Sequence, residues 1–145
     1  MRKFFKRSKP EPQVQNAVLQ RDGTPVTILI VDDSPTETHI LKGILERAGY
    51  RVITAENGER GVSSAIESTP SLILMDVVMP GLNGFQATRQ LSQTPETADI
   101  PIIMVSTKGQ ETDRAWGMRQ GARDYVVKPV SPDELLDKIS VVLNV

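Results

Sequence analysis

The stretch ILIVDDSP, residues 28–35, decides how this chain folds. Its first four residues are apolar and mostly β-branched, which is typical of a strand buried on both faces. Asp32 and Asp33 follow at once, and Ser34 and Pro35 then supply an N-cap and a first-turn proline for a helix. A buried strand that ends in two acids and leads directly into a helix indicates an α/β fold.

Strand-like apolar segments and segments of helical periodicity alternate from residue 26 to the end of the chain. Five strands that alternate with five helices indicate a parallel sheet with helices on both faces, and right-handed crossovers favour a doubly wound topology. We expect the unbroken apolar runs 28–31 and 72–75 at its centre. The predicted strands are 26–31, 51–55, 72–75, 102–105 and 124–127, and the predicted helices are 34–48, 59–68, 84–93, 111–120 and one that opens at Ser131.

The spacing of apolar residues predicts which helix faces point inward. In the second helix Val62, Ala65 and Ile66 form the inward face. Trp116, the single tryptophan, lies in the fourth helix, where the pattern is equally compatible with a core residue and with a partner surface. The inward face of the first helix is predicted to comprise Ile40, Leu41, Ile44, Leu45 and Ala48.

Charge divides the 145 residues into two parts. Residues 1–25 carry six basic and two acidic residues and are interrupted by Pro10 and Pro12, which predicts a flexible basic tail. Residues 26–145 carry 11 basic and 16 acidic residues and are predicted to form one domain. This acidic balance argues against nucleic-acid binding as the main activity. We interpret the tail as a solvated leader, with docking to an acidic partner or anionic lipid as the alternative.

The chain contains no cysteine, which excludes disulfides and thiolate metal sites. No apolar run approaches the length of about 20 residues that spans a bilayer. The basic N-terminus also lacks the apolar region of a secretory signal. We therefore expect a cytoplasmic protein without a transmembrane segment.

Polar side chains directly follow four of the five predicted strands. The carboxyl ends of parallel strands meet at one edge of the sheet, and ligands bind there, near the point where the strand order reverses. Three acids, a hydroxyl group and an amine are thus predicted to share one site. They are Asp32 and Asp33 after the first strand, Asp76 after the third, Ser106 and Thr107 after the fourth and Lys128 after the fifth.

Three crowded carboxylates repel one another, by roughly 4 kcal/mol for two charges ~4 Å apart at an effective dielectric constant of about 20. A fold retains such a cluster when a hard cation with oxygen ligands binds there. Mg²⁺ suits the pattern because it accepts one or two carboxylates, several waters and a phosphate oxygen. Lys128 can pair with a phosphoryl group as a point charge, and Ser106 can donate a hydrogen bond to it.

These motifs together resemble the CheY-like response-regulator receiver domain, over about residues 26–143. The resemblance implies a flavodoxin-like five-stranded sheet of strand order 2-1-3-4-5. A narrower similarity, to the PilH-type regulators of twitching motility and type IV pili, rests on the segments 32–37, 84–90 and 119–125. The four motifs that carry the family resemblance are ILIVDDS at 28–34, LMDVVMPG at 74–81, MVST at 104–107 and YVVKP at 125–129.

The resemblance implies a role for each residue of the site. Asp76 would be the nucleophile that forms an acyl phosphate, and Lys128 would contact the phosphoryl group. Asp33, Asp76 and the backbone carbonyl of Val78 would bind Mg²⁺ directly, whereas Asp32 would act mostly through a metal-bound water. Val78 cannot orient a hydrolytic water, so we expect slow autodephosphorylation.

The resemblance also implies a switch. Ser106 would move toward the phosphoryl group, Tyr125 would swing inward behind it, and the Lys128–Pro129 peptide bond would be cis. The face formed by the helix at 111–120, the strand at 124–127 and the last helix would then contact a target protein. Ser106 stands where the family often has threonine, and its hydroxyl preserves the function.

The function implied is that of a single-domain response regulator in a chemotaxis-like two-component phosphorelay. A CheA-like histidine kinase would phosphorylate Asp76, and the protein would signal by protein contact, without direct DNA binding, or act as a phosphate sink. It would be a phosphoacceptor switch rather than an enzyme.

Three alternatives use the same fold. An aspartyl-phosphate phosphatase would usually need a second acid at the position of Val78. A nucleotide or flavin binder would need the glycine-rich pattern that is missing after the first strand, where two acids stand instead. A receiver that has lost its chemistry would not need the intact acids, hydroxyl and lysine. The sequence therefore favours the phosphoacceptor switch over all three.

Overall fold

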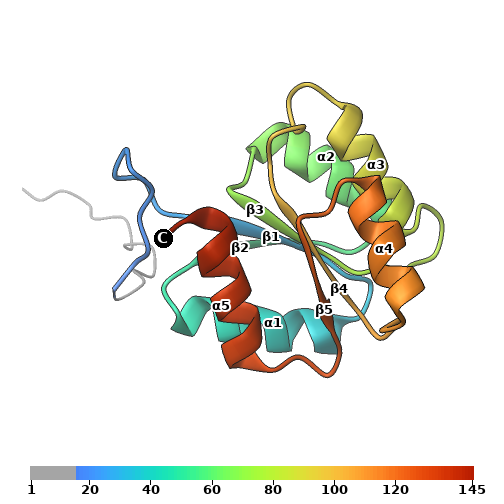
Figure 1. Cartoon of the computed structure of the whole chain (residues 1–145). Helices are drawn as coiled ribbons and strands as arrows, with labels where there is room; N and C mark the ends of the chain where they lie inside the picture. The colour runs from blue at the N-terminus through green and yellow to red at the C-terminus, as the bar shows by residue number, and fades with distance from the viewer. Residues whose placement is uncertain (1–15) are drawn as a thin grey trace, which may run out of the picture.

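A computed structural model of the protein describes residues 16–145 and has one parallel five-stranded sheet at its centre (Figure 1). The strand order is β2-β1-β3-β4-β5, so the predicted fold class is confirmed. The order reverses between β1 and β3, which makes their carboxyl ends the expected ligand site. The strands are β1 (Thr27–Val31), β2 (Arg51–Ala55), β3 (Leu72–Met75), β4 (Ile102–Ser106) and β5 (Asp124–Val127).

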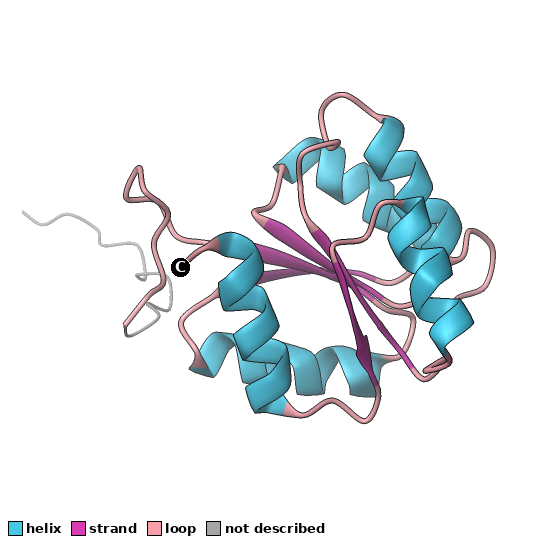
Figure 2. Ribbon diagram, in the orientation of Figure 1, coloured by secondary structure: helices cyan, strands magenta, loops and turns pink. Residues whose placement is uncertain are grey.

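Five helices cover the two faces of the sheet, α1 and α5 on one and α2, α3 and α4 on the other (Figure 2). The Ser34 hydroxyl accepts a hydrogen bond from the Glu37 backbone N–H at 3.2 Å, and Ser131 caps α5 in the same way. Both caps are followed by a proline in the first turn. The helices are α1 (Pro35–Arg47), α2 (Gly58–Ser68), α3 (Gly84–Gln93), α4 (Glu111–Gln120) and α5 (Pro132–Leu143).

The core lies on both faces of the central strands. β3 and β4 are buried along their whole length, as are the last four residues of β1. Because side chains alternate along a strand, Leu29 and Val31 pack toward α2 and α3, whereas Ile28 and Ile30 pack toward α1 and α5. The two central segments predicted from the sequence are therefore confirmed.

Two apolar residues predicted to face the core are exposed instead. Ile40 of α1 is 48% exposed and Ile66 of α2 is 40% exposed. Each lies about 90° around its helix from the centre of the buried stripe, because successive residues are ~100° apart. Trp116 is 47% exposed, which decides in favour of a surface position in α4.

The described part of the predicted tail contacts the domain. The Val18 N–H donates to the Gly49 carbonyl at 3.0 Å, and its carbonyl accepts from the Val26 N–H at 2.9 Å. The Val18 side chain packs against the core beneath α1 and α5, and an antiparallel bridge joins Leu19 to Pro25. Residues 1–15 of that predicted tail lie outside the described residues. Among residues 16–145, no helix has the length and hydropathy to cross a bilayer.

Candidate functional site

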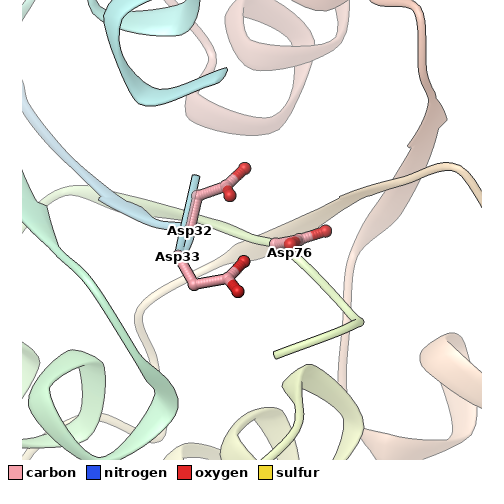
Figure 3. A group of neighbouring side chains, drawn as sticks. All are labelled: Asp32, Asp33 and Asp76. Carbon is pink, nitrogen blue, oxygen red and sulfur yellow. The ribbon is translucent and has the colours of Figure 1, made fainter. Parts of the chain in front are cut away.

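Three carboxylates meet at the carboxyl edge of the sheet, where the strand order reverses. Asp32 and Asp33 follow β1 and Asp76 follows β3, and one ligand oxygen from each lies within 4.8 Å of the others (Figure 3). The pairing of β1 with β3 brings them together, since the Asp76 N–H donates to the Val31 carbonyl at 2.9 Å. Asp32 and Asp76 are buried, whereas Asp33 is exposed.

Lys128, which follows β5, lies between the two buried acids. Its Nζ is 3.0 Å from Asp32 Oδ2 and 3.5 Å from Asp76 Oδ1. Its third neighbour is Glu37 of α1, with Oε1 at 3.8 Å. The sequence did not identify Glu37 as part of the site, because its contact with Lys128 depends on how α1 packs against the sheet. The ends of three strands, β1, β3 and β5, and the start of one helix, α1, thus contribute to this edge of the sheet.

The electrostatics follow from this crowding. Burial is the largest cause that raises the pKa of Asp76, and repulsion from Asp32 raises it further, to about 6. Attraction by Lys128 and a hydrogen bond from the Val77 N–H lower this pKa but do not cancel the rise. Burial alone would lower the pKa of Lys128, but its hydrogen bond to Asp32 and the charges of the neighbouring acids raise it overall. The site therefore stabilises a lysine cation and destabilises the Asp76 anion.

This raised pKa predicts how stability depends on pH. The pKa of Asp76 is about 6 in the folded protein and 3.8 ordinarily. At a pH between these two values, the Asp76 carboxyl is protonated in the folded state and ionised in the unfolded state. The free energy of unfolding in EDTA is therefore expected to fall as the pH rises from about 4 to about 6, by on the order of 2–3 kcal/mol. Urea unfolding of wild type and Asp76→Asn isolates this contribution. Parallel profiles for the two proteins would contradict it.

The hydroxyl groups predicted for the switch are those of Ser106 on β4 and Tyr125 on β5. Ser106 is buried at the end of β4, and its Oγ accepts a hydrogen bond from the Lys108 N–H at 3.1 Å, whereas Thr107 is exposed. Tyr125 of β5 is also buried, and its hydroxyl donates to the Lys108 carbonyl at 2.6 Å. Both side chains therefore hold the backbone of the same residue in the loop that leads to α4.

The loop after Asp76 is held by close backbone contacts. A Cβ at Gly84 would lie 2.0 Å from the Asp76 carbonyl oxygen, so only glycine permits this approach. Glu59 of α2 accepts a hydrogen bond from the Leu82 N–H at 3.1 Å. Val78 has an exposed side chain on this loop. The Lys128–Pro129 peptide bond, which follows β5, is cis, as expected.

The donor set fits a hard divalent cation. It consists of carboxylate oxygens without nitrogen or sulfur ligands, which is the chemistry that Mg²⁺ prefers. Three carboxylates beside one lysine leave an excess of negative charge for a cation to neutralise. Asp33 and Val78 are exposed to solvent, as the entry of a hydrated ion requires.

A doubly wound sheet with this acid trio and lysine at its carboxyl edge defines the class of receiver domains. Comparison with known proteins agrees, because residues 28–140 match the response regulator receiver domain family. The chain belongs to this family.

Three similar proteins come from bacteria. The chain is 60% identical to protein PilH of Pseudomonas aeruginosa over 116 residues, which cover 80% of this chain and 96% of PilH. The chemotaxis protein CheY4 of Vibrio cholerae superposes with a TM-score of 0.76 at 30% identity, over 81% of this chain and 98% of CheY4. The receiver domain of the P. aeruginosa sensor kinase PA1611 was solved with a coordinated magnesium ion and gives a TM-score of 0.76 at 30% identity, over 82% and 98% of the two chains.

Proposed function

We propose that this receiver domain is switched by transfer of a phosphoryl group to Asp76. The observation that carries the proposal is the convergence of Asp32, Asp33, Asp76 and Lys128 on one edge of the sheet. Asp33, Asp76 and the Val78 backbone carbonyl would hold Mg²⁺ directly, and Asp32 would hold it through water. When bound, Mg²⁺ supplies positive charge to the phosphoryl oxygens, as the PA1611 receiver with its magnesium ion supports.

The donor in this proposal is a phosphohistidine of a CheA-like histidine kinase. An Asp76 carboxylate oxygen attacks phosphorus and forms an O–P bond while the N–P bond of the donor breaks. The imidazole nitrogen leaves with the electron pair and takes a proton from water. Lys128 exchanges its Asp76 contact for a phosphoryl oxygen, and the Ser106 hydroxyl donates to another.

The signal then passes through Ser106 and Tyr125. Because both side chains bond to Lys108, movement of Ser106 toward the phosphoryl group would break its bond to the Lys108 N–H and free the loop that leads to α4. The added charge on Asp76 would thus shift the loop that leads to α4 between two conformations. The surface formed by α4, β5 and α5 would change as a result and would bind a target protein. With Val78 two residues after Asp76, hydrolysis of the acyl phosphate would be slow.

The 60% identity to PilH supports a place in a chemotaxis-like pathway that controls type IV pili and twitching motility. In that setting the protein would work in the cytoplasm, either by binding a motility protein or by draining phosphoryl groups from a second regulator. Both outputs need protein contacts and no catalysis on an external substrate.

A small phosphodonor tests the proposal without the kinase. Incubation with phosphoramidate and Mg²⁺ is expected to add one phosphoryl group, seen by intact-mass spectrometry. EDTA should reduce the addition to background, because it removes Mg²⁺. Without the cation, the negative charge of the carboxylates repels the phosphodonor. Equal incorporation with and without EDTA would contradict the metal assignment, and no incorporation in either would contradict the proposed function.

A further inference from the structure

A hollow lies between α3 and α4, away from the acids. It is a groove of about 490 Å³, within the range of ligand-binding sites in proteins. Its lining contains two arginines, one aromatic ring and three polar side chains, but no acid. The lining residues are Arg89, Ser92, Gln93, Trp116, Arg119, Gln120 and Gly121.

Close packing at one end forms this groove. Gly121 ends α4 with a φ of +119°, and a Cβ there would lie 2.1 Å from Ser92 Oγ of α3. The helices therefore touch at this point, and only glycine allows the contact. Gly117 and Gln120 are the buried residues of α4, so most of its side chains, including Trp116, point away from the core.

The two arginines are available to a ligand. Arg89 on α3 and Arg119 on α4 are both exposed, and neither forms an ion pair with any residue of the described range 16–145. The Arg119 guanidinium carbon lies 5.8 Å from the centre of the Trp116 ring. This cation–π contact orients the guanidinium before binding, which reduces the entropy lost on contact with a carboxylate.

We propose that this α3–α4 groove binds an acidic segment of a partner protein. Carboxylates of the segment would pair with Arg89 and Arg119, and an apolar side chain would pack on the exposed Trp116 ring. A protein partner fits better than a small anion because exposed tryptophan and arginine are the residues that dominate protein interfaces. The groove lies on the α3 side of α4, so it is separate from the face of α4, β5 and α5.

Intrinsic fluorescence of Trp116 reports binding directly, since the chain has no other tryptophan. The probe is a peptide of about 12 residues rich in glutamate and leucine, and its glutamine analogue is the neutral control. The acidic peptide is expected to shift the Trp116 emission to shorter wavelength with saturation. The Arg89→Ala/Arg119→Ala variant should bind it at least about tenfold more weakly.

The matched control is Arg47→Ala/Arg60→Ala, which removes the same two charges from exposed helix sites outside the groove. Among the described residues, the Arg60 side chain forms one ion pair, with the exposed Glu56 at 3.8 Å, so its loss should hardly affect folding. Unchanged binding in this control supports the proposal. Equal weakening in both variants, binding of the glutamine peptide, or no saturable binding would overturn it. Backbone NMR can locate the peptide. If the peptide changed the chemical shifts only in β5 and α5, or only in residues 1–15, it would bind outside the groove, which would also overturn the proposal.

Discussion

The Asp76→Asn variant is expected to take up no phosphoryl group from phosphoramidate and Mg²⁺. The carboxamide has almost the shape of the carboxylate and can still accept the 2.9 Å hydrogen bond from the Val77 N–H. It lacks the anionic oxygen that attacks phosphorus, and it removes one of the proposed metal ligands. Intact-mass spectrometry measures the result directly, and we expect complete loss rather than slower transfer.

A matched control separates this chemistry from general charge effects. Asp99 is an exposed acid far along the chain, and Asp99→Asn makes the same change outside the site. It should be phosphorylated like the wild type. Incorporation into Asp76→Asn at the wild-type level would assign the phosphoryl group to another residue, and peptide mapping would then identify it.

The Lys128→Ala variant is expected to lose about 3 kcal/mol of unfolding free energy in EDTA at neutral pH. It leaves Asp32 and Asp76 buried without the cation that lies 3.0 and 3.5 Å from them. Removing one partner of a buried ion pair typically costs about 3–5 kcal/mol. The lower value is expected because Asp76, whose pKa is already raised, can take up a proton and relieve part of the repulsion.

Lys138→Ala is the control for this effect. Lys138 forms an ion pair of similar length, 3.1 Å, with Asp124, but both side chains are partly exposed to water. Its loss should therefore cost about 1 kcal/mol or less. Urea unfolding compares the two variants, and Mg²⁺ should restore part of the stability of Lys128→Ala only. Similar losses in both variants would show that burial does not strengthen the Lys128 contacts.

Local signals explain why most of the fold could be predicted. The N-cap Ser34 and the proline after it mark the start of α1, and the pair Ser131 and Pro132 marks α5 in the same way. Strands β1 and β3 read as continuous apolar runs because they are covered on both faces. The site was predictable for a related reason, since residues that directly follow parallel strands must meet at one edge of the sheet.

Tertiary packing decided what these signals left open. Ile40 and Ile66 have helical spacing but lie at the edge of the buried stripe, because the sheet covers a narrower face of each helix than the pattern suggests. Likewise, Val18 is held at the core by its hydrogen bond to the carbonyl of Gly49, which is distant in sequence, and by a second hydrogen bond with Val26. Both outcomes depend on contacts between residues that are not adjacent in the sequence.

The sequence by itself determined the family, the alternation of strands and helices, and the identity of the acids and lysine at the sheet edge. Each of these depends on residue order within one element and on the parallel geometry of strands. Only the tertiary structure placed Glu37 3.8 Å from Lys128 and formed the groove between Arg89 and Arg119. Both depend on how helices from distant parts of the chain rotate and pack against one another, which no local pattern encodes.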